Sequence, residues 1–451
     1  MRQPVAGFVC FGEVNTPSEL IQEKRRMAEQ WLKQAEVDII PAGVVTDDPD
    51  GAQANAAIET LLAQSFDFLV ICIAGWIPSW TVVKVASAFA HHPMLLWGLS
   101  GRTTNGRLVS TADQAGTTAL RKVLDDLAYS FKYVYHVPDG EPSIGAVSSF
   151  ARAARTASLL RRATVGMMGY RDMKLYGTMF DGIKLKRLLG VEIEFFEMLE
   201  IVQRREGISD DRIGDIVKSV RANWEFEKPA KDETLQTGAG LYAAIRDKVC
   251  ESHYDAVSLI DVDGMKKLLG FPPAMIFMLL GEEPGVCTIP ENDALGAVTQ
   301  LIVRYLTGQA APYMEFYEFM EDRVLIGVPD FVPSEIVDGR VRVTPTAFGG
   351  LGEGVLNISK VRTGPVTLVR LTESGEGYAI HAITGRAEAP RPWEEAGWQP
   401  PAPQLPSLEV VLDLPVVEFA QKVLSQHYII AYGDILDEIA DLRTVLHIDE
   451  W

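Results

Sequence analysis

The sequence has few cysteines and no apolar run long enough to cross a membrane. Its four cysteines show none of the spacings that bind zinc or carry out thiol redox chemistry. They are Cys10, Cys72, Cys250 and Cys287. We therefore expect buried, reduced thiols in a cytoplasmic chain, because a reducing compartment does not favour disulfides. A bilayer-spanning helix needs about 20 apolar residues, and the start of the chain reads as a strand rather than a signal peptide. We expect no membrane role.

The sequence also has fewer basic residues than acidic residues. The chain has 42 Lys and Arg residues against 61 Asp and Glu residues, which gives a formal net charge of −19. This charge repels phosphate backbones, and the sequence has no basic stripe with interleaved aromatic residues that would act against it. We therefore expect no nucleic-acid partner, and a small neutral or cationic ligand is favoured.

The first part of the chain alternates between buried-strand and helix patterns, which predicts a parallel sheet. The continuous apolar run 66–74 is typical of a central strand, and it ends at Gly75-Trp76. Trp76 could stack on the apolar face of a sugar ring, or it could pack between sheet and helix as a core residue. Residues 100–106 contain glycine without the spacing of a phosphate-binding loop, so we expect a plain loop with Arg102 as a candidate substrate contact.

Turn residues and a change in pattern predict three domains in the 451 residues. The segment 138–143 is rich in turn formers, and a new strand follows at 163–168. After Met320, short β-rich runs separated by Gly, Pro and polar turns predict an antiparallel barrel or sandwich. The predicted domains are an N-terminal α/β domain at 1–145, a central α/β domain at 146–320 and a C-terminal β-rich domain at 321–451. The fold class is therefore two Rossmann-like α/β domains with parallel sheets, followed by an antiparallel β-barrel-like domain.

Two acids in the segment 285–320 are candidates for a shared site. A short strand leads through a turn containing Glu291 into a helix whose apolar residues recur from Ala294 to Leu306. A second strand pattern at 312–320 places Glu315 on the face opposite to Glu318. If both strands join one parallel sheet, Glu291 and Glu315 meet at its carboxyl edge, where open α/β sheets bind ligands. The alternative is that one acid stabilises a helix dipole and the other is solvated.

A further pair of acids, Asp261 and Asp263, follows the strand pattern at 254–260. Acids two residues apart suggest an oxygen-ligand loop, but the rest of a calcium-loop pattern is absent. We therefore expect solvated turn acids outside the site.

The segment from Glu291 to Glu315 resembles the metal-binding segment of the L-fucose isomerase and L-arabinose isomerase superfamily. The resemblance lies in Glu291-Asn292-Asp293, Leu295-Gly296, Leu306-Thr307-Gly308 and an acid 24 residues after the first. In that family the two acids are metal ligands. The resemblance thus implies that Glu291 and Glu315 bind a divalent ion such as Mn²⁺ and act as the catalytic acid and base.

A third ligand is implied near the end of the chain, at His427. By itself, this histidine at the head of an apolar run indicates packing in a core. Members of the superfamily carry a metal-binding histidine before a turn similar to Tyr432-Gly433-Asp434. Arabinose isomerases have another ligand histidine soon after the second acid, whereas 322–330 contains none in this chain. The comparison therefore favours the fucose isomerases, which use three ligands.

The resemblance implies a metal-dependent aldose–ketose isomerase that converts a pentose or a deoxy or substituted hexose through an enediol. Trp76 would be a sugar platform, and we favour its supply by a neighbouring subunit of a homo-oligomer, a hexamer or trimer. Two alternatives remain open: a non-catalytic sugar-binding or regulatory protein, and another metal-dependent sugar enzyme such as an epimerase or aldolase. We also expect activity to rise towards neutral pH as His427 loses its proton, because an ordinary histidine has a pKa near 6.5.

Overall fold

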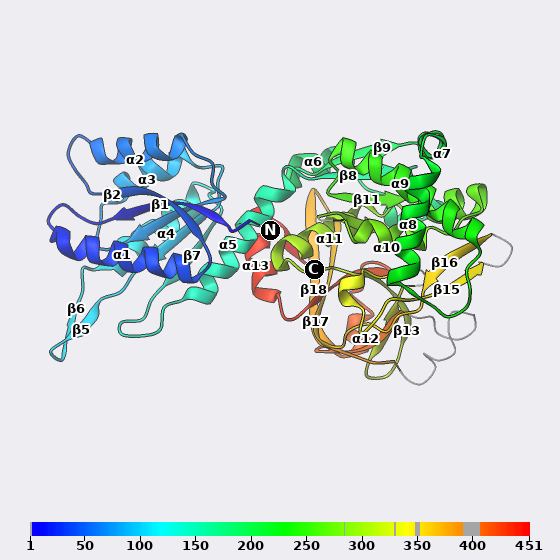
Figure 1. Ribbon diagram of the computed structural model, residues 1–451. Helices are drawn as coiled ribbons and strands as arrows, with labels where there is room; N and C mark the ends of the chain where they lie inside the picture. Colours follow the sequence, from blue (N-terminus) through cyan, green and yellow to red (C-terminus); the bar gives the residue numbers. More distant parts are fainter. Residues whose placement is uncertain (1, 284, 329–330, 348–351, 391–405) are drawn as a thin grey trace. The chain divides into compact units, whose positions relative to one another are not determined.

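The computed structural model describes residues 2–283, 285–328, 331–347, 352–390 and 406–451. The chain forms two compact units (Figure 1). Unit 1 contains Met1–Leu159 and Asp437–Ile448, and unit 2 contains Leu160–Leu436 and Asp449–Trp451. The predicted boundaries of three domains stay a prediction. In the described part of the chain, no helix combines the length and apolarity needed to span a bilayer.

Unit 1 is built on a parallel sheet with the strand order β2-β1-β3-β4-β7. The strands are β1 (Val5–Phe11), β2 (Asp38–Val45), β3 (Phe68–Ile73), β4 (Met94–Gly98) and β7 (Phe131–Tyr135). The helices are α1 (Ser18–Gln34), α2 (Ala52–Leu62), α3 (Ser79–Ala88), α4 (Asp113–Asp126), α5 (Ile144–Leu160) and α13 (Leu436–Leu446). Every residue of β3 is buried, as its continuous apolar run predicts. Residues of α2, α3 and α4 pack with Val9 and Phe11 on one face of the sheet.

The segment predicted to be a plain loop at 100–106 is instead part of a β-hairpin. Its strands are β5 (Arg102–Thr104) and β6 (Arg107–Val109), which pair antiparallel. Asn105 and Gly106 both have positive φ angles, 52° and 73°. Two such residues form the tight turn whose twist matches a hairpin, so Asn-Gly was the signal for it.

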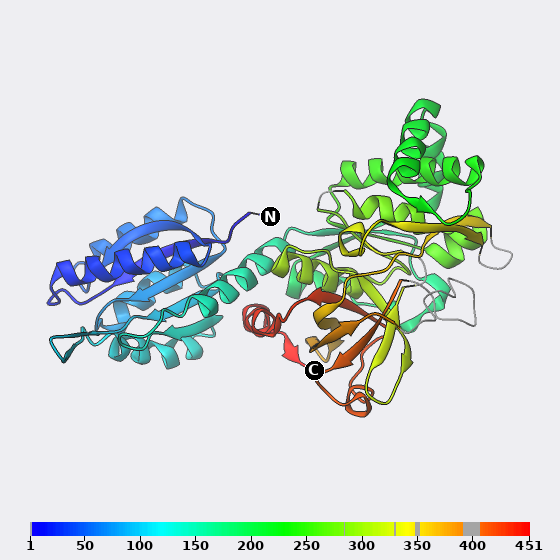
Figure 2. The same cartoon turned by 60° about the horizontal axis from the view of Figure 1, so that its bottom comes forward.

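Unit 2 combines a parallel sheet with an antiparallel barrel (Figure 2). The parallel order is β12-β11-β8-β9, from β8 (Thr164–Met168), β9 (Glu192–Phe196), β11 (Ala256–Leu259) and β12 (Cys287–Ile289). The barrel sheet has the order β17-β20-β13-β14-β19-β18-β21; its pairings are antiparallel except that of β18 with β21, and β17 also pairs with β18, which closes the barrel. Its strands are β13 (Tyr313–Phe319), β14 (Val324–Gly327), β17 (Gly364–Ser374), β18 (Gly377–Glu388), β19 (Ser407–Leu412), β20 (His427–Tyr432) and β21 (Asp449–Glu450). The predicted fold class is confirmed.

A smaller sheet and several helices complete unit 2. The sheet has the order β10-β15-β16, from β10 (Glu225–Phe226), β15 (Arg342–Ala347) and β16 (Glu353–Asn357). The helices are α6 (Gly182–Leu189), α7 (Met198–Glu206), α8 (Asp210–Asn223), α9 (Asp232–Ser252), α10 (Ala274–Gly281), α11 (Ala294–Thr307) and α12 (Val416–Phe419). Helix α11 ends at Gly308, whose φ of 75° is the left-handed conformation typical of a helix stop.

Two sequence-based expectations about local structure are wrong. The strand that carries Glu315, β13, does not extend the parallel sheet; it pairs antiparallel with β14 and β20. Alternating residues identify a strand but not its partner, and the short link from Phe319 to Val324 allows only an antiparallel hairpin. All four cysteines are free, but Cys250 is exposed whereas the other three are buried.

Candidate active site

Glu291 lies on a strained turn between β12 and α11. Glu291 and Asn292 have φ angles of 63° and 53°. This left-handed conformation costs a residue such as glutamate roughly 1–2 kcal/mol, whereas asparagine tolerates it better. Hydrogen bonds hold the turn in place: the Asn292 side chain donates to the Met168 carbonyl at 2.9 Å, and the Glu291 backbone N–H donates to Asp261 Oδ1 at 3.0 Å. Strain that the surroundings maintain in this way is a feature of functional sites.

Asp293, at the end of this turn, anchors α11 and is neutralised by a fixed cation. Its carboxylate accepts the Gly296 backbone N–H at 2.8 Å, and Arg370 binds both of its oxygens at 2.6 and 3.0 Å. Burial opposes ionisation, but Arg370 and the hydrogen bonds keep the pKa of Asp293 below its usual value. A Cβ at Gly296 would lie 2.6 Å from Asp293 Oδ2 and 2.9 Å from the Tyr313 ring. Only glycine therefore fits at position 296, in the pair Leu295-Gly296.

His427 begins β20, directly opposite Glu315 of β13. Its ring stacks on that of Tyr313, with centroids 4.2 Å apart, and the Tyr313 hydroxyl donates to Asp293 Oδ2 at 2.9 Å. Burial lowers the pKa of His427 to about 3, so the imidazole is neutral at physiological pH. Its Nδ1 lies 3.8 Å from Glu291 Oε2. A fixed, neutral imidazole beside a carboxylate can act as a metal ligand.

Glu291 itself lies among other acids. Burial, followed by the charges of Asp261, Glu315, Asp293 and Asp172, raises the pKa of Glu291 to about 9. The Gln426 side-chain amide lies 3.3 Å from Glu291 Oε2. Without a further cation, Glu291 therefore holds a proton at neutral pH. A divalent ion would replace that proton, because a nearby positive charge favours the carboxylate.

Asp261 was expected to be a solvated turn acid, and this expectation is wrong. Its side chain is 3% exposed, and its Oδ2 lies 3.1 Å from the Nζ of Lys266, which is 6% exposed. Asp172 is buried beside it and accepts the backbone N–H groups of Val262 and Asp263 at 2.8 and 2.7 Å. Burial and the hydrogen bond to Asp261 raise the pKa of Asp172 to about 7. The sequence signal was the position of Asp261 directly after a buried strand, at the carboxyl edge of the sheet.

The chemical types of the donor atoms in Glu291, Glu315 and His427 are suitable for a divalent ion. Two carboxylates and a neutral imidazole suit Mn²⁺ and related ions. The distance of 3.8 Å between His427 Nδ1 and Glu291 Oε2 is within the span of two ligands that each lie roughly 2.0–2.2 Å from one ion. Among the described residues, no three His, Cys, Asp or Glu side chains are arranged closely enough to hold an ion. The ligand roles of Glu291, Glu315 and His427 therefore stay predictions.

Trp76 and Arg102, the predicted substrate contacts, both lie in unit 1. Trp76 is 39% exposed, which excludes the alternative that it is a buried core residue. Its backbone is held by bonds to the Thr111 carbonyl at 2.7 Å and from the Glu13 N–H at 2.9 Å. Arg102 lies on β5, where it forms an exposed ion pair with Glu23 at 2.5 Å. Their contacts with substrate stay predictions.

The chain has two full-length relatives of low identity. It is 20% identical over 465 aligned positions to proteins named sulfoquinovose isomerase from Priestia aryabhattai and from Priestia megaterium strain ATCC 12872 / QMB1551. The alignments cover 100% of this chain and 99% of each relative. No protein-family model matches the chain.

Solved structures that align with the chain include two binding proteins of ABC transporters. One is an ABC transporter solute-binding protein from Burkholderia multivorans, with a TM-score of 0.19, 13% identity and coverage of 57% of this chain and 79% of that chain. The other is the arabinose-binding protein of an ABC transporter from Shewanella sp. ANA-3, with a TM-score of 0.18, 13% identity and coverage of 68% and 86%. At these scores the likeness supports no conclusion.

Proposed function

We propose that the chain is an enzyme that interconverts an aldose and a ketose. The observation that carries this proposal is the placement of Glu291 and His427 within 3.8 Å of each other, with Glu315 opposite His427 on the neighbouring strand. The full-length likeness to two proteins named sulfoquinovose isomerase supports a sugar isomerase over a non-catalytic sugar-binding protein.

The reaction moves a proton between C1 and C2 of an open-chain sugar through an enediol. A bound Mn²⁺ or related ion would stabilise the negative charge that develops on the sugar oxygens. Glu291, Glu315 and His427 would hold this ion. Glu291 or Glu315 would carry the proton between the two carbons. The hydrogen bond from the Glu291 backbone to Asp261 and the stacking of His427 on Tyr313 keep these groups in position.

The names of the relatives favour a sulfonated hexose as the substrate class, which is one of the predicted options beside a pentose and a deoxyhexose. Trp76, exposed after β3, would present its ring to the sugar from a neighbouring subunit of a homo-oligomer.

The test is an aldose panel in which sulfoquinovose, neutral hexoses, deoxyhexoses and pentoses are each incubated with and without Mn²⁺. We expect ketose formation from at least one aldose, followed by NMR, and exchange of the C2 proton with solvent. Metal analysis of the purified protein should give about one divalent ion per chain, consistent with a single set of three ligands. A different product with retained metal would favour an epimerase or aldolase, and sugar binding without turnover or metal would favour a binding protein.

A further inference from the structure

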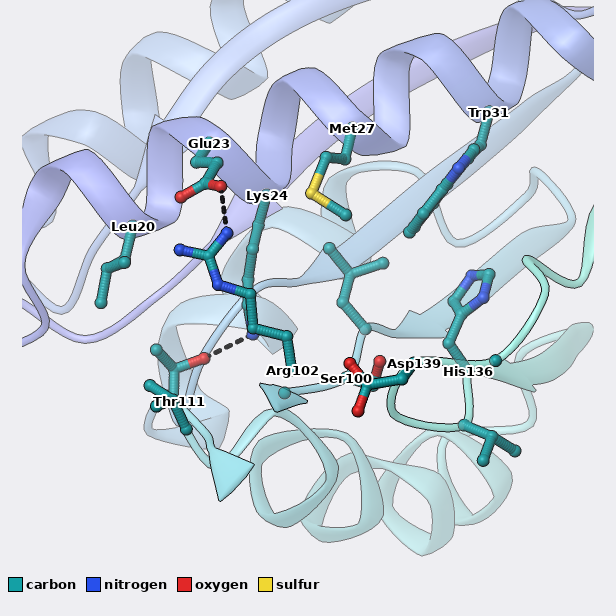
Figure 3. A pocket seen from close by; sticks show the side chains of 15 residues that line it. Leu20, Glu23, Lys24, Met27, Trp31, Ser100, Arg102, Thr111, His136 and Asp139 are labelled. Carbon is teal, nitrogen blue, oxygen red and sulfur yellow. Dashed lines mark hydrogen bonds and ion pairs between the residues drawn. The ribbon is translucent and has the colours of Figure 1, made fainter. Parts of the chain in front are cut away.

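A cavity of about 210 Å³ lies in unit 1, between α1 and the hairpin formed by β5 and β6 (Figure 3). Leu20 and Met27 line it from α1, while Leu99, Ser100 and Val137 line it from the segments that follow β4 and β7. The cavity is therefore at the carboxyl ends of parallel strands, which is the edge at which open α/β sheets bind ligands. Its described lining contains neither Trp76 nor any residue of unit 2.

One end of the cavity is an uncharged aromatic wall. Trp31 stacks on His136 with ring centroids 4.6 Å apart. Trp97 Nε1–H donates to His136 Nε2 at 2.7 Å, and burial lowers the pKa of His136 to about 4. A protonated ring could not accept this hydrogen bond, so His136 stays neutral. The aromatic end, together with Met27 and Leu99, offers apolar surface, and the Asp139 carboxylate lies beside His136 (Figure 3).

The opposite end is polar, and the charges of Glu23, Arg102 and Lys24 there are paired. Glu23 and Arg102 form an ion pair at 2.5 Å across the mouth (Figure 3). Lys24 forms an ion pair with the buried Asp113 and donates to the Thr111 hydroxyl at 2.7 Å. An anionic ligand would have to disrupt these pairs, and the Asp139 carboxylate, which accepts the Thr103 backbone N–H at 2.9 Å, is a further acceptor for a hydroxyl group. A neutral ligand would find a carboxylate acceptor beside a guanidinium donor, which is the combination that neighbouring hydroxyl groups need.

We propose that this cavity binds an uncharged monosaccharide at a site separate from Glu291, Glu315 and His427. Pockets for drug-sized ligands measure about 300–1,000 Å³, so a cavity of about 210 Å³ suits a single ring. The apolar face of the sugar ring packs against Met27 and Leu99, and its hydroxyl groups reach Glu23 and Arg102. The proposal does not depend on the isomerase function, because it requires neither a metal ion nor turnover.

The test uses full-length Glu291→Gln protein, in which conversion of sugars should be strongly reduced. D-glucose, D-galactose and L-arabinose are titrated by saturation-transfer NMR and by Trp31 fluorescence, with Trp31→Phe as the assignment control. We expect saturable binding that Val109→Trp, which fills the cavity, weakens at least tenfold. Leu108→Trp is the matched control, because Leu108 is the neighbouring exposed residue of the same strand and does not line the cavity.

A second pair of variants tests the polar end. Arg102→Gln should weaken binding at least tenfold, since it removes a hydrogen bond from a charged group. Arg107→Gln, on the partner strand of the hairpin, should leave it unchanged. The proposal is overturned if none of the three sugars shows binding that Val109→Trp reduces. It is also overturned if adenosine, as a neutral heterocycle, binds there and the sugars do not. Neither result bears on ketose formation by the unmodified protein.

Discussion

Glu291 and Asp293 lie two residues apart on one turn, yet their surroundings are opposite. Asp293 is held by Arg370, Tyr313 and a backbone N–H, and its pKa is lowered. Glu291 is partly buried near Asp261 and Glu315, with 15% of its side chain exposed, and its pKa is raised to about 9. The acid that supports the fold has a fixed cation as its partner. The acid assigned to chemistry is placed where a mobile cation would relieve repulsion, so the surroundings of an acid indicate its role better than its burial does.

The largest expected effect is the loss of catalytic activity when Glu291 or Glu315 is replaced. Glu291→Gln and Glu315→Gln should each lower kcat by about 10²–10⁴-fold, the usual contribution of a positioned acid or base. Both should also weaken Mn²⁺ binding, measured by calorimetry. The unfolding free energy should not fall for Glu291→Gln, because a neutral amide replaces a carboxyl that is already protonated. Glu318→Gln, on the exposed part of β13, is the control. Parental turnover and C2 exchange in both variants would remove these acids from the mechanism.

Substitution of Asp293 should lower the unfolding free energy. Asp293→Asn leaves the Arg370 guanidinium buried without its charge partner, which costs about 3–5 kcal/mol of unfolding free energy. Urea denaturation measures this loss. The double variant Asp293→Asn/Arg370→Met should lose less than the sum of the two single variants, because it removes both charges. Asp322→Asn, an exposed ion-pair partner of Arg323, should cost no more than about 1 kcal/mol. Equal losses at the two sites would contradict the comparison.

Metal binding should release a proton from Glu291. Its pKa of about 9 means that the carboxyl is protonated at pH 7 in the metal-free protein, and ligation requires the carboxylate. Calorimetry in two buffers of different ionisation enthalpy should show about one proton released per Mn²⁺ at pH 7, and less above pH 9. In metal-free protein, the raised pKa of Glu291 also makes the unfolding free energy depend on pH. The stabilising contribution of the protonated carboxyl is fully present below the unfolded-state pKa of 4.5, and it is lost as pH rises through the folded-state pKa of about 9. Glu291→Gln should remove both effects.

This pH dependence corrects the expectation that His427 controls activity near neutrality. Burial lowers the pKa of His427 to about 3, so the imidazole is already neutral across the physiological range. Activity that depends on the metal should instead rise into the alkaline range with the ionisation of Glu291. A rise centred near pH 6.5 that persists in Glu291→Gln would contradict this assignment.

The smallest expected effect concerns Asp261, which touches only the backbone of Glu291. Asp261→Asn should weaken Mn²⁺ binding by about 10-fold to 100-fold, as loss of a group that orients a ligand usually does. The Glu291 side chain remains, so some turnover should persist. Asp263→Asn is a matched control, because Asp263 lies in the same segment and forms a partly exposed ion pair with Lys267. Equal effects of the two changes would show that Asp261 has no special role.

Local patterns in the sequence predicted local structure well. The helical spacing from Ala294 and the stop at Gly308 correspond to α11, and the run 66–74 contains β3. Partners far apart in the chain were not predicted. Arg370 lies 77 positions after Asp293, and β13 pairs with a strand more than 100 residues later. Alternation and spacing describe a segment's own faces, whereas these pairings depend on how the barrel closes.

The return of the chain to unit 1 at its end has a consequence for biosynthesis. Helix α13 belongs to unit 1, where Asp441 binds Lys132 at 2.7 Å and Ser149 at 2.6 Å, and Glu438 pairs with Arg152. Asp441 and Glu438 are translated about 300 residues after the helix and strand that they contact. During translation, the surface of β7 and α5 that contacts α13 therefore stays uncovered until nearly the whole polypeptide has emerged. A stop codon before Asp437 would leave the N-terminal unit incomplete although every one of its first 159 residues had been made.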